Sequence, residues 1–136
     1  MGVAEARLIS IGVECGWERA NDFLAQPANF ALWAEGLAET LRQEGERWLV
    51  QTPAGEATVR FTAWNEFGVF DHWIDFADGS TVYVPLRVVA NGDGCEVTLT
   101  LFRLPGMSEE KFREDAAWVK RDLVRLKALL VGASAR

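Results

Sequence analysis

Several residue types are scarce in this chain of 136 residues, and each scarcity excludes a class of protein. Only two cysteines, Cys15 and Cys95, and one histidine, His72, are present. Their spacing forms neither a zinc motif nor a redox pair, so we expect no metal site and two reduced thiols. No apolar run approaches the ~20 residues of a membrane span, and the N-terminus lacks the layout of a signal peptide. We therefore expect a cytoplasmic protein with no membrane span.

Positive charge and catalytic motifs are also in short supply. The chain carries 14 basic residues against 20 acidic ones, a net charge of -6, and no cluster of Lys or Arg interrupts this balance. Such a protein repels nucleic acid, so we expect no nucleic-acid partner. There is no glycine-rich phosphate loop, nucleophile elbow or paired-carboxylate arrangement, which predicts that no cofactor is bound.

Apolar residues, by contrast, are plentiful. They make up 49% of the chain, and they include six Trp and eight Phe. A chain of this length folds as one domain, residues 1–136, that buries about two-thirds of the surface exposed when it is unfolded. The aromatic rings indicate either a large core or a hollow that they line.

One long amphipathic helix is predicted from Ser108 to Leu130. Ser108 suits the N-cap, and Glu109 and Glu110 follow in the first turn, where the helix dipole favours negative charge. Apolar residues recur at steps of four and three, which places them on one stripe of the helix: Phe112, Ala116, Val119, Leu123, Leu126 and Leu130.

The rest of the chain is predicted to be mainly strands. Residues 7–15 alternate as a first strand, and residues 17–34 read as two short helices that meet at Pro27. Turn residues then divide six further strands, at residues 37–44, 47–52, 56–65, 69–76, 81–90 and 95–103.

The turns also predict the register of the later strands. Pairing Ala90 with Cys95 sets Val88 opposite Val97, Leu86 opposite Leu99 and Val84 opposite Leu101. A three-residue turn that ends in Gly79 sets Ile74 opposite Val82 and His72 opposite Val84. His72, Phe61 and Phe70 then share an apolar face, while the other face carries Asp71, Asp75, Arg60, Arg87 and Tyr83. Because the apolar face needs a cover, we expect the long helix to lie across it, in an α+β fold.

This element order, with the strings VYVPLRVVANGDGCEVTLTLFRLPGM and EEKFREDAAWVKRDLVRLKALL, resembles the START-related lipid-transfer and polyketide-cyclase (SRPBCC) superfamily, which includes the birch pollen allergen. The resemblance implies a helix-grip fold, in which a curved, seven-stranded antiparallel sheet wraps around the long C-terminal helix. Two short helices after the first strand close one end of a cavity. It also implies that Cys15 and Cys95 lie on neighbouring strands. The superfamily has no common catalytic motif, so the resemblance implies the location of a site but not its chemistry.

The predicted cavity gives a set of candidate ligand-binding residues, each with a simpler alternative. His72 is a candidate general base or a buried core histidine, and Arg103 binds an anionic head group or forms a surface ion pair. Trp118 edges the cavity mouth or packs at the helix margin. Trp48 and Phe30 could join the other rings in an aromatic lining, although core packing alone explains most of these rings. The full candidate set is Trp33, Phe61, Phe70, His72, Val84, Leu99, Arg103, Phe112 and Trp118.

The sequence supports three hypotheses of function. The first is binding of a hydrophobic small molecule, such as a lipid, an isoprenoid or a polyketide-like compound. The alternatives are a cyclase or dehydratase that uses His72 for proton transfer, and an interaction domain like the co-chaperone members of the superfamily. Homodimerisation through a sheet edge or through Trp64, Trp73 and Tyr83 is also consistent with the sequence.

Overall fold

The computed structural model describes residues 2–35 and 40–134. The chain begins with strand β1 (Ala6–Val13), helix α1 (Trp17–Leu24), a 3-10 turn (Pro27–Asn29) and helix α2 (Phe30–Trp33). The strands that follow are β2 (Arg42–Glu44), β3 (Arg47–Thr52), β4 (Gly55–Phe61), β5 (His72–Asp75), β6 (Thr81–Val84), β7 (Leu86–Asn91) and β8 (Gly94–Phe102). Helix α3 (Glu109–Ser134) completes the order. The start of the strand predicted at residues 37–44 lies outside the described residues.

Helix α3 begins where the sequence predicts. The Lys111 N–H donates to Ser108 Oγ at 3.0 Å, which confirms Ser108 as the N-cap. The apolar stripe faces inward, and Phe112, Leu123 and Leu126 are at most 1% exposed. The helix continues to Ser134, past the predicted end at Leu130, and no proline interrupts it.

The predicted single sheet of seven strands is wrong, because the described residues form eight strands in two sheets. The orders are β1-β8-β7 and β2-β3-β4-β5-β6. The strand predicted at residues 81–90 is broken at Pro85, which has no N–H to donate to a ladder. β6 therefore stays with β5 while β7 pairs with β8, and the predicted pairing of Val84 with Leu101 is absent from the described ladders.

The rest of the predicted register is confirmed. Ala90 pairs with Cys95, Val88 with Val97 and Leu86 with Leu99. In the second sheet, His72 lies opposite both Val84 and Phe61, and Ile74 lies opposite Val82. The turns predict these pairs correctly because loop length fixes register wherever one face of a sheet is buried.

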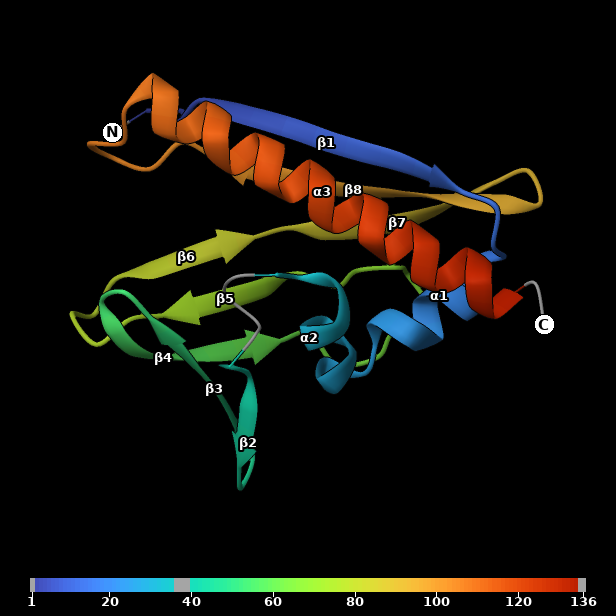
Figure 1. The fold of residues 1–136 in the computed structure, drawn as a ribbon, viewed down its shortest axis with the longest axis horizontal. Helices are drawn as coiled ribbons and strands as arrows, with labels where there is room; N and C mark the ends of the chain where they lie inside the picture. The colour runs from blue at the N-terminus through green and yellow to red at the C-terminus, as the bar shows by residue number, and fades with distance from the viewer. Residues whose placement is uncertain (1, 36–39, 135–136) are drawn as a thin grey trace.

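The long helix covers the three-stranded sheet and not the whole strand layer. α3 packs on β1 and β8 and also contacts α2, and Figure 1 shows it running along these strands, with α1 near its C-terminal end and α2 below its middle. The core between helix and sheet includes Leu86, Val88, Val97, Leu123 and Leu130, and a smaller cluster on the second sheet contains Val50, Ala57, Val59 and Ile74. No helix in the described ranges is both long and apolar enough to cross a membrane.

The two sheets meet at a buried carboxylate. Asp71 is only 4% exposed, although the sequence predicts it on the solvated face. Its oxygens accept two hydrogen bonds from Arg87 at 2.8 Å, one from the Tyr83 hydroxyl at 2.7 Å and one from the Leu86 N–H at 3.0 Å. Burial acts to raise the pKa of Asp71, but these donors together hold it below its ordinary value. Asp71 thus connects β6 and β7 across the break at Pro85.

Candidate functional site

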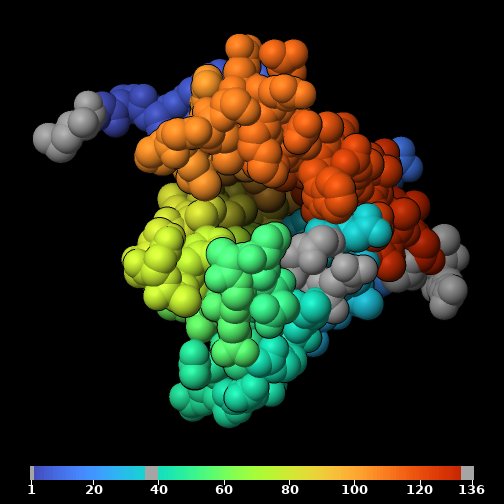
Figure 2. Space-filling model, turned by 60° about the vertical axis from the view of Figure 1, so that its left-hand side comes forward, coloured from blue at the N-terminus to red at the C-terminus, as the bar shows by residue number. Residues whose placement is uncertain are grey.

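A cleft of about 320 Å³ lies between α3, α2 and the ends of both sheets. Figure 2 shows the surface hollowed where α3, in orange, meets the strands coloured green and yellow. Most of its wall is apolar, and five predicted residues line it: Trp33, His72, Val84, Leu99 and Trp118. The break at Pro85 lies beside this space, because Val84, the last residue of β6, lines it together with Leu99 and Leu101 of β8.

His72 forms part of the inner wall. The register of β5 directs its imidazole to the same face as Phe61, and the ring lies 4.9 Å from Phe30 and 6.0 Å from Phe61 between centroids. Burial lowers the pKa of His72 from its ordinary 6.5 to about 4, although the Phe70 backbone and the Asp71 charge oppose this. The imidazole is therefore neutral at pH 7, a form that can accept or donate one hydrogen bond.

Asp122 is a polar wall residue that the sequence analysis missed. Asp122 as a whole is 8% exposed, and its Oδ1 accepts a hydrogen bond from the Glu35 N–H at 3.2 Å. Burial raises the pKa of Asp122 from 3.8 to about 6, against the Glu35 N–H and the charge of Arg125 at 3.5 Å, which both lower it. The signal was present in the sequence: an acidic residue stands between Val119 and Leu126 at the spacing of the buried stripe.

Polar side chains of α3 fasten the α2 side of the cleft in place. Trp118 Nε1 donates to the Glu35 carbonyl at 3.2 Å, and the Arg125 guanidinium donates to the Trp33 carbonyl at 3.3 Å. Arg125 also forms a 2.8 Å ion pair with the Glu35 carboxylate. Trp118 is 44% exposed, so it lies at the edge of the cleft and not in its depth.

The other predicted ligand-binding residues lie elsewhere. Phe61 and Phe70 border a void of about 20 Å³ next to the cleft, behind His72. Phe112 is 1% exposed in the core, and the Arg7 guanidinium lies 5.3 Å from its ring centroid. Arg103 forms a 3.1 Å ion pair with Glu5 and donates to the Met107 carbonyl at 2.9 Å. The structure thus places Arg103 in a surface ion pair, the simpler of its two alternatives.

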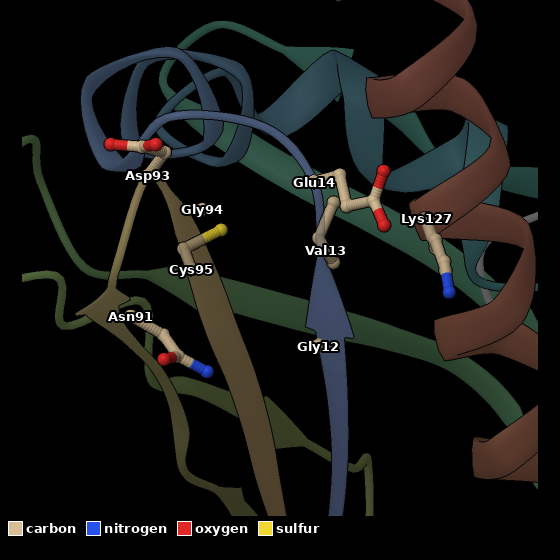
Figure 3. Close-up of a pocket in the computed structure, with 8 residues that line it drawn as sticks. All are labelled: Gly12, Val13, Glu14, Asn91, Asp93, Gly94, Cys95 and Lys127. Atoms are coloured by element: carbon tan, nitrogen blue, oxygen red, sulfur yellow. The ribbon is translucent and has the colours of Figure 1, made fainter.

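A larger hollow, of about 570 Å³, lies at the C-terminal end of β1 and the N-terminal end of β8. Figure 3 shows that its residues come from β1, the β7–β8 turn and α3, with the charged groups of Glu14, Asp93 and Lys127 around it. Cys95 lies on its floor, and burial, together with Cys15 and Glu96, raises the pKa of this thiol. A high pKa disfavours the nucleophilic thiolate, and a polar, turn-lined hollow suits solvent better than an apolar ligand. We assign it no role.

The two cysteines lie near each other, as the resemblance implies. Cys95 pairs with Val13 across β1 and β8, and Cys15 follows two residues later; both thiols are free and buried. Within the described ranges no three His, Cys, Asp or Glu side chains are grouped to hold a metal ion.

Of the aromatic residues suggested for a homodimer contact, Trp73 and Tyr83 lie on the face of β5 and β6 opposite His72 and Val84, whereas Trp64 follows β4 and donates to Asp22 of α1. Trp64 is 59% and Tyr83 38% exposed, and Tyr83 stacks between Trp73 at 5.4 Å and Phe102 at 6.2 Å. Dimerisation through this face stays a prediction.

Known structures share this fold at low sequence identity. No protein-family model and none of the curated proteins match the sequence. The structure of XoxI from Bacillus cereus aligns with a TM-score of 0.71 and 12% identity, covering 95% of this chain and 97% of that one.

Two further solved structures align over more than nine-tenths of this chain. DynU16, a putative protein in the dynemicin biosynthetic locus, aligns with a TM-score of 0.68 and 14% identity, covering 96% of this chain and 49% of that one. The Aha1 dimer from Colwellia psychrerythraea aligns with a TM-score of 0.65 and 12% identity, over 93% of this chain and 96% of that one. At these identities the likeness shows that this chain shares the fold of these proteins: an α+β domain with antiparallel strands under a long C-terminal helix.

Proposed function

We propose that this protein binds a hydrophobic small molecule in the cleft between α3, α2 and the strands, as an SRPBCC-type domain. The observation that carries the proposal is the cleft itself. Its volume of about 320 Å³ falls at the lower end of the range typical of ligand sites, ~300–1,000 Å³. Its wall combines an apolar majority with a few polar groups, the composition that holds and orients an apolar ligand.

The ligand class follows from the wall. Trp33, Phe30 and Trp118 present ring surfaces, and Leu99 and Val84 present aliphatic ones. A compact apolar compound with one or two polar groups fits this set, such as an isoprenoid, a short lipid or a polyketide-like ring. The fold shared with DynU16, from a biosynthetic locus, supports a natural-product ligand.

Two matched substitutions on α3 test the proposal. Val119 lines the cleft, whereas Val124 on the same helix is 49% exposed. Val119→Trp fills the cleft, so we expect it to weaken binding of the neutral fluorescent probe N-phenyl-1-naphthylamine at least tenfold. Val124→Trp adds the same indole to the surface and should change the affinity less than twofold. Equal probe affinity in the two variants, with both folded by circular dichroism, would contradict the proposal.

A second candidate function is proton-transfer catalysis, as in a polyketide cyclase or dehydratase. His72 favours it, because a neutral imidazole lines the cleft and can accept a proton. His72→Phe keeps an apolar ring beside Phe30 and removes the proton acceptor. Loss of turnover of a poly-β-ketone test substrate, with N-phenyl-1-naphthylamine binding retained, would favour the enzyme; turnover that persists would exclude His72 as the base.

A further inference from the structure

The polar groups of the cleft wall share one chemical character. They are the neutral imidazole of His72 and the carboxyl groups of Glu35, Asp115 and Asp122, and no Lys or Arg lines the cleft among the described residues. A site for a fatty-acid carboxylate or a phosphate would instead present a cation, most often Arg.

Two cations beside the cleft are paired with these acids, and Arg121 lies over the Trp118 ring, 4.9 Å from its centroid. Arg125 is engaged by the Glu35 carboxylate and the Trp33 carbonyl, and Lys111 Nζ lies 2.6 Å from Asp115 Oδ1. These pairs balance the charge of the acids at the mouth, yet the carboxyl groups and not the cations line the cavity. Carboxylates accept several hydrogen bonds each, so they can still accept from a ligand.

Asp122 is the acid best placed to bind a ligand, because it is the most buried of the three. Its side chain is 12% exposed, against 29% for Asp115 and 51% for Glu35. Oδ1 accepts the Glu35 N–H, which fixes the carboxyl group, while Oδ2 receives no hydrogen bond from the residues that the structure describes. His72 lies on the same wall, but the Phe70 backbone already interacts with its imidazole. The cleft therefore holds a buried carboxyl oxygen, Oδ2 of Asp122, with free acceptor capacity.

We propose that the cleft selects ligands whose polar end donates hydrogen bonds, a hydroxyl or an ammonium group, and that Asp122 is the acceptor. This specificity rests on the proposed binding function. A ligand carboxylate at the same place would face three carboxyl groups in a partly desolvated site, where the nearby cations Arg125 and Lys111 are already paired with those acids. A hydroxyl or ammonium group would instead satisfy Oδ2 of Asp122.

Three ligands with the same twelve-carbon chain test the specificity: dodecanol, dodecylammonium and dodecanoate. Each displaces N-phenyl-1-naphthylamine at pH 7.5, at concentrations below micelle formation. We expect dodecanol and dodecylammonium to bind at least tenfold tighter than dodecanoate. Raising the salt concentration should weaken dodecylammonium more than dodecanol, which separates recognition of charge from recognition of a hydroxyl donor.

Matched neutralising variants assign the effect to Asp122. Asp122→Asn keeps the size of the side chain and should reduce the preference for dodecylammonium over dodecanoate at least tenfold. Asp93→Asn makes the same change of net charge at the β7–β8 turn, outside the cleft, and should leave the preference unchanged. Melting temperatures of both variants confirm that each is folded.

The outcomes separate the two proposals. Dodecanoate binding as tightly as dodecanol and dodecylammonium would overturn the specificity while leaving ligand binding in place. An unchanged preference in Asp122→Asn would overturn the role of Asp122. Failure of the probe and of all three ligands to bind the wild-type protein would overturn the proposed function itself.

Discussion

At the scale of single residues, two titratable groups in one cleft are shifted in opposite directions by the same cause. Burial disfavours the charged form of each, which lowers the pKa of His72 to about 4 and raises that of Asp122 to about 6. Between these values both groups are neutral, whereas at pH 7.5 Asp122 is ionised and His72 stays neutral. Opposed shifts of this kind are typical of functional sites.

These shifts predict opposite pH dependences of stability. As the pH falls from 6.5 to about 4, the unfolded chain protonates its histidine before the folded chain does, so the free energy of unfolding should drop by up to about 3 kcal/mol through His72. As the pH falls from about 6 to 3.8, the folded chain protonates Asp122 first, which should raise the free energy of unfolding by about 3 kcal/mol. The two contributions nearly cancel in the wild-type protein.

Single substitutions separate the two contributions, measured by urea denaturation between pH 6.5 and 4. In Asp122→Asn only the contribution of His72 remains, so the free energy of unfolding should fall with decreasing pH. In His72→Phe only the contribution of Asp122 remains, so the free energy of unfolding should rise with decreasing pH. Asp71, Asp75 and Asp78 have lowered pKa values and therefore act below this window. Parallel profiles in the two variants would show that the cleft is not buried as described.

At the scale of elements, one side of α3 packs in the core and another side lines the cleft. Its central stripe, with Leu123 and Leu126 fully buried, packs into the core under the three-stranded sheet. The side that carries Trp118, Val119 and Asp122 forms one wall of the cleft. Stability and binding should therefore respond to different residues of the same helix.

Leu123→Asp and Trp118→Ala distinguish these sides. Leu123 is 0% exposed, so a carboxylate there is unpaired and desolvated, and we expect the domain to be unfolded at 25 °C by circular dichroism. Trp118 is 44% exposed, so its removal should lower the melting temperature by only a few degrees while weakening probe binding severalfold. A folded Leu123→Asp protein, or unchanged binding in Trp118→Ala, would contradict this division of the helix.

At the scale of the whole molecule, the two sheets depend on one another through Asp71. The carboxylate is buried and bound by Arg87, Tyr83 and the Leu86 N–H, groups from β6 and β7. Because the β7–β8 ladder ends at Leu86 and the β5–β6 ladder ends at Val84, these bonds help hold the sheets in register across Pro85. The cleft opens beside this junction, so its shape depends on it.

A comparison of two ion pairs tests this dependence. Arg87→Met leaves the Asp71 charge buried with fewer donors, and we expect the free energy of unfolding to fall by about 2 kcal/mol or more. Arg60→Met removes the partner of Asp75, whose side chain is 34% exposed, and should lower the free energy of unfolding by less than Arg87→Met does. Urea denaturation at pH 7 measures both, and equal losses would show that Asp71 is not a special junction.

The sequence by itself determined most of the element order, with the exception of the strand at residues 81–90, and also most of the register and the N-cap of the long helix. Each of these depends on local physics: Ser108 accepts an N–H three residues away, and a turn such as that at residues 92–93 sets the pairing of Ala90 with Cys95. The inward direction of His72 followed from the same local reasoning, because side chains alternate strictly along a strand.

Only the tertiary structure decided how the sheet divides and which side chains meet in the cleft. Pro85 was visible in the sequence, but whether it bends one strand or separates two sheets depends on where α3 and β8 lie. Phe112 and Arg103 lie outside the cleft, and Asp122 lies in its wall, because the path of α3 across the strands depends on packing between distant segments. Local patterns predict which face of an element is buried, whereas long-range contacts determine what that face touches.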